Sequence, residues 1–238
     1  MSSRFVAAGY TIPKYLIEVD GKKVIKHIVD LYPKDSDFVF IINDKHEKET
    51  NIVEVLEGIS ENKEIVTVSR HKKGPVFSVS QFENLIEDDE PVIVNYCDFS
   101  IEWNYEKFKE HVEYTECDGS VICYTGFHPH MLGSDNYAFC RTEEEKILEV
   151  REKQPFTDDK MSEFASAGNY YFRKGSYVKK YFKQLMDEDI NINGEYYVSL
   201  IYNLMIRDGL YNTVFEVPHM LQWGTPGDLD IYNSWSNY

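Results

Sequence analysis

The chain has 238 residues, of which 42% are hydrophobic and 15% aromatic, and 25 Lys+Arg against 41 Asp+Glu give a formal net charge of −16. This length and apolar content predict one folded domain over residues 1–238 and exclude a disordered chain, while the negative charge disfavours nucleic acid as a partner. No apolar run approaches the roughly 20 residues of a membrane span and no signal pattern opens the chain, so we expect a cytoplasmic protein with no membrane partner.

The first half of the chain alternates between helix patterns and strand patterns. Helical spacing over Lys22 to Tyr32 precedes the apolar run Asp37 to Asn43, which is typical of a strand buried on both faces. Helix patterns at 48–58, 78–86 and 105–112 then precede strand patterns at 64–68, 91–95 and 120–124. This alternation predicts an α/β fold with a mostly parallel central sheet flanked by helices.

The second half has a different pattern. Strand patterns at 137–141, 147–149 and 167–172 follow one another without long helices between them. Helix patterns return at 177–186 and 195–207, and a strand pattern follows at 213–217. We therefore predict a smaller antiparallel insertion that covers one end of the sheet, within a single domain because no linker or repeat interrupts the chain.

Ligands of open α/β sheets bind beyond the carboxyl ends of the strands. The apolar run that starts at Pro91 ends on Asn95, and Asp98 follows it. A carboxylate at such a strand end can hold Mg²⁺ on nucleotide phosphates, and the alternative is that Asp98 caps the next turn.

The N-terminal stretch contains two cations and two hinge residues within a few positions. Ser3-Arg4-Phe5 is followed by Gly9 and by Pro13-Lys14. Such a group in an acidic protein suggests a phosphate clamp, and a solvated loop is the alternative.

Several motifs occur in the order found in nucleotide-sugar pyrophosphorylases: Ser3-Arg4-Phe5, Gly9-Tyr10, Pro13-Lys14, Asp98, Glu152-Lys153, Gly168 to Phe172 and Trp223 to Pro226. The whole chain resembles this nucleotidyltransferase superfamily, which implies a Rossmann-like sheet of the GT-A type. The finer resemblance, carried by Asn95-Tyr-Cys-Asp98 and residues 126–133, is to the branch of campylobacter capsule biosynthesis that transfers CMP from CTP to phosphorylated glutamine. A sugar 1-phosphate is the alternative acceptor within the same branch.

The resemblance implies a nucleotide site around the N-terminal cations. Arg4 matches the cation on the pyrophosphate side, with Ser3 beside it, and Lys14 matches the cation that bridges the phosphates. Asp98 matches the family's Mg²⁺ ligand and Asn95 precedes it in the same segment. These roles require alignment and charge neutralisation from the protein, which supplies no nucleophile.

The second metal ligand departs from the family pattern. The family has an aspartate two residues before the Gly of the late Gly-Thr motif, and Gln222 stands there in this chain. Asp230 is a nearby carboxylate that could complete the Mg²⁺ site. Asp228 is better explained as a helix cap, because Thr225-Pro226-Gly227-Asp228 has the form of a helix start.

The remaining implied residues concern the base and the second substrate. Gly74 before Pro75 is a candidate for the base site, where the family uses backbone groups. Glu152 and Lys153 match the pair that faces the phosphorylated acceptor, with a surface ion pair as the alternative. The other candidates for acceptor contacts are His128, His130, Asn169 and Glu195. Packing, or a metal role without a visible third ligand, is the alternative for the two histidines.

The resemblance also implies an apolar strand and a Gly-rich loop directly before the Ser-Arg pair, where this sequence has Met1 and Ser2. Either the central strand of the sheet is missing or residues before Met1 are. Because loss of a central strand would leave unpaired edges inside a core, we expect intact-mass spectrometry to give more than 27.9 kDa.

Two further classes stay open beside a cytidylyltransferase. A glycosyltransferase of the same general fold usually has an Asp-x-Asp motif at a strand end, which the segment Asn95 to Asp98 lacks. A non-catalytic nucleotide sensor would fit the Gln222 departure and the absent loop.

Overall fold

The computed structural model describes residues 3–133 and 135–236. They divide into two compact units. Unit 1 comprises Met1–Arg70, Tyr96–Tyr105 and Met220–Tyr238, and unit 2 comprises His71–Asn95 and Glu106–His219. Within the described ranges, no helix is both long and apolar enough to cross a membrane.

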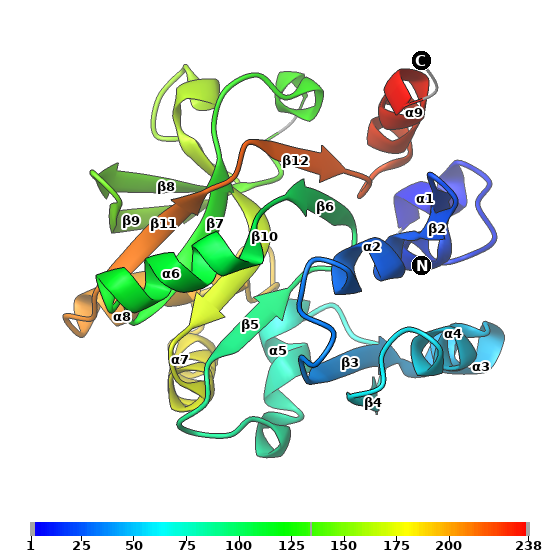
Figure 1. The fold of residues 1–238 in the computed structure, drawn as a ribbon, viewed down its shortest axis with the longest axis horizontal. Helices are drawn as coiled ribbons and strands as arrows, with labels where there is room; N and C mark the ends of the chain where they lie inside the picture. The colour runs from blue at the N-terminus through cyan, green and yellow to red at the C-terminus, as the bar shows by residue number, and fades with distance from the viewer. Residues whose placement is uncertain (1–2, 134, 237–238) are drawn as a thin grey trace. The chain divides into compact units, whose positions relative to one another are not determined.

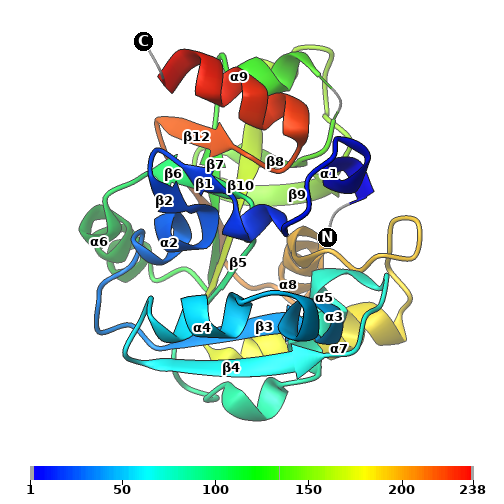
Figure 2. The ribbon, with the colours of Figure 1, turned by 90° about the vertical axis from the view of Figure 1, so that its right-hand side faces the viewer.

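Unit 1 contains a parallel strand pair and several short helices. Strand β3 pairs in parallel with β4, from Phe38↔Lys63 to Asn43↔Val68. Figure 2 shows α3 and α4 lying along this pair. The elements are α1 (Ser3–Ala7), the 3-10 turn η1 (Lys14–Leu16), β1 (Glu18–Val19), β2 (Lys22–Lys23), α2 (Val24–Val29), β3 (Phe38–Asn43), α3 (Asp44–Glu49), α4 (Ile52–Glu57), β4 (Lys63–Val68), β6 (Phe99–Glu102) and α9 (Pro226–Ser236), with β12 (His219–Gln222) paired to β6.

Two apolar clusters hold unit 1 together. One packs Leu16 and Ile25 against Ile42 of β3 and against Ile52 and Leu56 of α4. The other gathers residues from both ends of the chain around Trp223: Phe5, Ile17, Val19, Val24, Ile28 and Leu229. The N-terminal segment and the C-terminal helix are therefore fixed by shared burial.

Unit 2 contains a six-stranded sheet with the order β5-β10-β7-β11-β9-β8. Figure 1 shows α6 lying across this sheet. Its elements are α5 (Gly74–Ser80), η2 (Glu83–Leu85), β5 (Val92–Asn95), α6 (Tyr105–Thr115, whose first residue belongs to unit 1), β7 (Gly119–Tyr124), η3 (Pro129–Leu132), β8 (Ala138–Glu143), β9 (Lys146–Glu152), η4 (Lys160–Ser162), β10 (Phe164–Phe172), α7 (Gly175–Asp187), η5 (Val198–Leu200), α8 (Ile201–Arg207) and β11 (Asn212–Glu216).

Both faces of the unit 2 sheet are covered, as the rings of two successive residues of β10 show. Tyr171 makes an edge contact with Phe108 of α6, whereas Phe172 packs against Phe182 of α7 and Tyr202 of α8. Because neighbouring residues of a strand face opposite sides, α6 lies on one face and α7 with α8 on the other.

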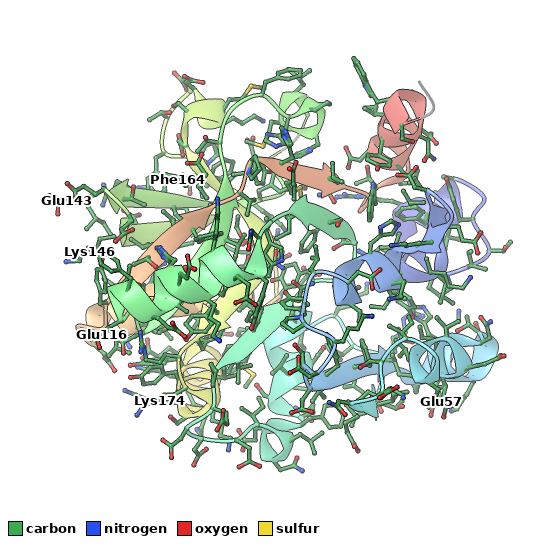
Figure 3. The ribbon with its side chains drawn as sticks, in the orientation of Figure 1. Glu57, Glu116, Glu143, Lys146, Phe164 and Lys174 are labelled. Carbon is green, nitrogen blue, oxygen red and sulfur yellow. The ribbon has the colours of Figure 1, made fainter. Side chains whose placement is uncertain are left out.

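The mixed α/β class predicted from the sequence is confirmed, but the predicted strand directions need correction. Of the pairings described in the six-stranded sheet, β7 with β11 is parallel, and those of β10 with β5, β7 and β8, of β8 with β9 and of β9 with β11 are antiparallel. The β8–β9 hairpin brings Glu143 opposite Lys146 (Figure 3). The sheet is therefore mostly antiparallel, because β10 returns between β5 and β7 instead of extending a parallel series.

Helix boundaries also differ from the predicted ones. The pattern at 48–58 covers two helices, since Thr50 is extended (φ −138°, ψ 168°) between α3 and α4. The pattern at 78–86 belongs to a helix that begins earlier, at Gly74 with Pro75 in its first turn, and that ends at Ser80. The pattern at 195–207 contains a turn and the 3-10 segment η5 before α8 begins at Ile201.

Candidate active site

Lys14 and Asp98, which lie 84 positions apart in the sequence, are in direct contact in unit 1. The Lys14 ammonium donates a hydrogen bond to the Asp98 carboxylate. Lys14 opens the turn η1, which the burial of Leu16 anchors, and the backbone N–H of Trp223 donates to the Asp98 carbonyl at 3.1 Å. Both side chains of the pair remain about a quarter exposed, at 25% and 24%. The pair is thus fixed by the backbone but open to a ligand.

The charge state of Lys14 follows from its surroundings. Burial alone would lower the pKa of its ammonium, but the Asp98 carboxylate raises it and the net direction is upward. The charge of Arg4 acts in the opposite direction on the pKa of Lys14, which places Arg4 within electrostatic reach. Lys14 and Asp98 therefore form a contacting pair, and Arg4 is a second cation of unit 1 whose charge acts on Lys14.

Arg4 is held near this pair by its neighbours in α1. Phe5 is fully buried and contacts the ring of Tyr10 edge-on at 5.0 Å between centroids. Gly9, with φ +85°, makes the turn between them in a conformation that other residues rarely adopt. Arg4 itself is exposed. Ser3 is the first residue of α1, and its side chain lies outside the described part of the chain.

Gln222, which stands at the position of the family's second metal-binding aspartate, and Gly224 both adjoin Asp98. A Cβ built on Gly224 would lie 2.7 Å from Asp98 Oδ2 and 3.1 Å from Gln222 Oε1. The Gln222 oxygen also accepts the N–H of Gly224 at 3.0 Å. A carboxylate oxygen and an amide oxygen therefore face the same small space above Gly224.

The predicted helix start at Thr225 is confirmed. The Thr225 hydroxyl accepts the N–H of Asp228 at 3.2 Å and donates to the Asp228 carboxylate at 2.6 Å, at the beginning of α9. This reciprocal pattern satisfies a backbone donor of the first turn. Asp230 lies further along α9 and is exposed. In the part of the chain that the structure describes, no three His, Cys, Asp or Glu side chains gather closely enough to hold a metal ion.

In unit 2, Asn95 and Asn169 form a hydrogen-bonded pair. They stand opposite each other in the β5–β10 register, and the Asn169 amide donates to the Asn95 side-chain oxygen. Asn169 is fully buried. The predicted nucleotide residue Asn95 and the predicted acceptor residue Asn169 are therefore direct neighbours.

Glu152 is a buried carboxyl at the end of β9. It is 9% exposed, and the Ser199 hydroxyl donates to its Oε2 at 2.6 Å. Burial raises the pKa of Glu152 to about 7, and the hydrogen bond from Ser199 and the charge of Lys153 only partly oppose this. Glu152 thus changes its charge near neutral pH.

Lys153 follows Glu152 in a left-handed conformation, with φ +59°. Its ammonium lies 4.3 Å from the ring centre of Tyr197 and donates a hydrogen bond to the phenol oxygen. The same phenol is hydrogen-bonded to Glu195. Tyr197 thus links Lys153 to Glu195, and Ser199 holds Glu152. Tyr197 and Ser199 were not predicted because they lie in an apolar stretch interpreted as helix.

His128 and His130 lie in a buried aromatic cluster. They are 5% and 9% exposed, their ring centres are 5.4 Å apart, and both rings contact Tyr124. Burial lowers the pKa of His130 to about 3, so its ring is neutral and shares a hydrogen bond with the Tyr124 hydroxyl at 2.9 Å. These contacts agree with the alternative in which the two histidines only pack against their neighbours. Their binding of the acceptor stays a prediction.

Gly74 has a steric reason to be glycine. Its φ is +83°, and a Cβ at this position would lie 2.6 Å from the carbonyl oxygen of Tyr196 and 2.7 Å from its nitrogen. The Tyr196 carbonyl also accepts the N–H of Val76 at 3.3 Å. The glycine lets the start of α5 approach the Tyr196 backbone, and its role in base binding stays a prediction.

Comparison with known proteins identifies the class. Residues 2–197 match the family described as nucleotidyl transferase, so the chain belongs to that family and is a nucleotidyltransferase. A comparison with the curated proteins gave no match.

Solved structures share the fold over nearly the whole chain. The nucleoside-diphosphate-sugar pyrophosphorylase from Vibrio cholerae RC9 matches with a TM-score of 0.79 and 21% identity, covering 98% of this chain and 96% of that one. The inositol-1-phosphate CTP transferase from T. maritima matches with a TM-score of 0.69 and 14% identity over 98% and 90%. A CMP:2-keto-3-deoxy-manno-octonic acid synthetase complexed with CTP gives 0.65 and 14% over 96% and 94%.

Proposed function

We propose that the protein is a Mg²⁺-dependent cytidylyltransferase that transfers CMP from CTP to a phosphorylated acceptor and releases pyrophosphate. The observation that carries this proposal is the contact between Lys14 and Asp98 in unit 1, with the charge of Arg4 acting on the same lysine. Two cations and one carboxylate suit a triphosphate with a divalent cation better than a neutral ligand. The solved structures named for CTP support cytidine as the base.

The reaction requires one bond to form and one to break. An oxygen of the acceptor phosphate attacks the α-phosphorus of CTP in line, and the bond between the α-phosphorus and the bridging oxygen to the β-phosphorus breaks. Negative charge then accumulates on the leaving pyrophosphate. Arg4 offers a planar fork of donors for its terminal oxygens, while the compact Lys14 ammonium suits the bridging region.

The residues around Asp98 fit Mg²⁺ brought in with the nucleotide. The Asp98 carboxylate and the Gln222 amide present hard oxygen atoms to one space, and Mg²⁺ is usually held by one or two carboxylates together with phosphates. Bound Mg²⁺ would neutralise charge on the phosphates. Lys14 contacts Asp98 in the structure and would be available to the phosphates if that carboxylate held the cation. Asp230 remains a second candidate ligand.

The acceptor site is proposed in unit 2, where Lys153 supplies the cation for the acceptor phosphate. Glu152 and Glu195 are the flanking carboxyl groups. The acceptor we propose is L-glutamine phosphate, so that the protein acts as a CTP:phosphoglutamine cytidylyltransferase in capsular phosphoramidate biosynthesis in the cytoplasm. Transfer to a sugar 1-phosphate of capsule synthesis is the alternative, supported by the likeness to a nucleoside-diphosphate-sugar pyrophosphorylase.

Pyrophosphate release measured with four nucleoside triphosphates and both acceptor types tests the proposal. We expect release only with CTP, Mg²⁺ and L-glutamine phosphate together. Release with a sugar 1-phosphate instead selects the alternative. Rejection of CTP with every acceptor overturns the cytidylyltransferase proposal, and CTP binding without turnover indicates a nucleotide sensor.

A further inference from the structure

In unit 2, hydrogen bonds join three polar side chains in series: Lys153, Tyr197 and Glu195. Lys153 stands directly after β9, and its backbone N–H donates to the Tyr137 carbonyl at 2.8 Å. Its left-handed backbone then directs the side chain over the ring of Tyr197. Tyr197 is 9% exposed, whereas Lys153 and Glu195 are half-buried. A buried phenol thus lies between a cation and a carboxylate that solvent still reaches.

The chemistry of the three groups fixes the direction of both hydrogen bonds. An ammonium only donates, an ionised carboxylate only accepts, and a phenol can do one of each. Lys153 therefore donates to the oxygen of Tyr197, and the hydroxyl of Tyr197 donates to Glu195. Glu195 is itself held in a tight turn by two backbone hydrogen bonds with Ile192, each of 3.0 Å. The backbone that carries the Glu195 side chain is therefore fixed in place.

We propose that Tyr197 is a positioning residue for Lys153, and that Glu195 acts on the acceptor site through Tyr197. This inference rests on the proposed function, in which Lys153 binds the acceptor phosphate. Among the described residues, the Lys153 ammonium makes one side-chain hydrogen bond, so two of its three N–H donors remain for phosphate oxygens. The phenol fixes the ammonium in space, which reduces the rotamer entropy that phosphate binding would otherwise cost.

A phenol has an advantage over a carboxylate in direct contact with Lys153. A carboxylate on the ammonium would repel the incoming phosphate from the same position, because the repulsion grows as the distance between the charges shrinks. The intervening phenol orients Lys153 while it keeps the charge of Glu195 one group further away. The neighbouring Glu152 is held separately by Ser199 and does not need the ammonium as its hydrogen-bond partner.

Isothermal titration calorimetry with inorganic phosphate tests the inference without turnover. The comparison includes wild type, Lys153→Ala, Tyr197→Phe and the control Tyr196→Phe, which removes a neighbouring phenol that donates to Asp189 at 2.7 Å. Tyr197→Phe keeps the ring and removes the hydroxyl. We expect it to weaken the phosphate binding that depends on Lys153 by about tenfold, as is typical for loss of a hydrogen bond to a charged group. Tyr196→Phe should bind phosphate as wild type does.

The two proposals fail in different ways. If Lys153→Ala binds phosphate as tightly as wild type, the acceptor role of Lys153 is wrong, and the inference falls with it. If Lys153→Ala weakens binding but Tyr197→Phe does not, the inference alone is wrong. Because Glu195 acts through Tyr197, adding Glu195→Ala to Tyr197→Phe should weaken phosphate binding little further. A double variant whose loss of affinity equals the sum of the two single losses would contradict the proposal that Glu195 acts through Tyr197.

A second set of variants covers the case in which Tyr197→Phe does not fold. Glu195→Gln keeps an oxygen that can accept the phenol hydroxyl and should retain most of the phosphate affinity, whereas Glu195→Ala should lose about tenfold. Equal affinity in these two variants overturns the inference. In steady-state kinetics, Glu195→Ala should raise the KM for the acceptor and leave the KM for CTP unchanged, a division that general unfolding would not produce.

Discussion

Each unit contains a lysine that is connected to a carboxylate by hydrogen bonds, and the two connections differ. Lys14 contacts Asp98 directly with both side chains a quarter exposed, whereas Lys153 reaches Glu195 only through the buried phenol of Tyr197. A partly exposed ion pair contributes little to stability, so its groups can exchange partners at small cost. A buried polar network stabilises only while it is complete. Substitutions in the unit 1 pair should therefore reduce turnover, and those in the unit 2 network should also reduce stability.

Asp98→Asn should give the largest change in turnover. It removes the negative charge that the Lys14 ammonium contacts and that we assign to Mg²⁺. We expect kcat to fall by about a hundredfold to a thousandfold, the range for removing one electrostatic group from a reaction of this kind. The midpoint of thermal unfolding should change little. Both quantities can be measured on the same preparation.

Asp30→Asn is the matched control for Asp98→Asn. Asp30 is also paired with lysines of unit 1, since Lys22 lies 3.1 Å away and Lys26 contacts it directly. We assign this carboxylate no role in the reaction, so turnover should stay at the wild-type value. An Asp98→Asn enzyme that keeps full turnover would remove Asp98 from the mechanism, and with it the contrast between the two units.

Gly74→Ala should destabilise unit 2 strongly, by about 4 kcal/mol. The left-handed φ costs an alanine about 1–2 kcal/mol, and the contact of the new Cβ with the Tyr196 backbone adds about 1–3 kcal/mol. Gly126→Ala separates the two contributions, because Gly126 has φ +78° with nothing within 4 Å of its Cβ position. Chemical denaturation of both variants measures the difference. Equal losses would show that Tyr196 imposes no steric restriction on Gly74.

Glu152→Gln should remove a pH dependence of stability. Burial raises the pKa of Glu152 from 4.5 to about 7 in the folded protein, so between these values the folded state keeps a proton that the unfolded state has lost. The stabilising contribution of protonated Glu152 to the unfolding free energy is therefore fully present below pH 4.5 and is lost as the pH rises through about 7. The loss is on the order of 3 kcal/mol.

Urea unfolding at pH 5 and at pH 7.5 tests this sign. The difference in unfolding free energy between the two pH values should shrink in Glu152→Gln and persist in Glu110→Gln, a control on the exposed surface of α6. A wild-type pH dependence that survives in Glu152→Gln would show that this carboxyl titrates normally and that the network around Tyr197 is more solvated than its burial indicates.

Local features of the fold were predictable from the sequence. The strands β3, β4, β5 and β7 to β11 coincide with predicted strand patterns, whereas the short strands β1, β2, β6 and β12 were not predicted. The cap at Thr225 follows from four consecutive residues. Strand direction was not predictable in this way. The apolar pattern of a strand that pairs antiparallel, such as β10, does not differ from that of a strand that pairs in parallel, because strand direction depends on partners distant in the sequence.

The candidate sites show the same limit. Arg4, Lys14 and Asp98 were related through a family resemblance, since nothing local to position 14 indicates contact with position 98. Tyr197 was missed because a tyrosine in an apolar stretch is usually a packing residue, and its polar role appears only when Lys153 and Glu195 lie at its hydroxyl. Gly74 was interpreted as part of a base site, although its need for glycine comes from the distant backbone of Tyr196.

Gly224→Ala should reduce turnover by a smaller factor than Asp98→Asn does. A Cβ on Gly224 would lie 2.7 Å from Asp98 Oδ2, so the carboxylate must move although its charge is kept. We expect kcat to fall by about tenfold, because a displacement below 1 Å costs less than the hundredfold typical of 1 Å. Gly227→Ala, three residues along in α9 with nothing within 4 Å of its Cβ position, should leave kcat unchanged. If Gly224→Ala has the same kcat as Gly227→Ala, the position of the Asp98 oxygen is not critical. The negative charge of Asp98, acting at a distance, would then account for the effect of this residue on turnover.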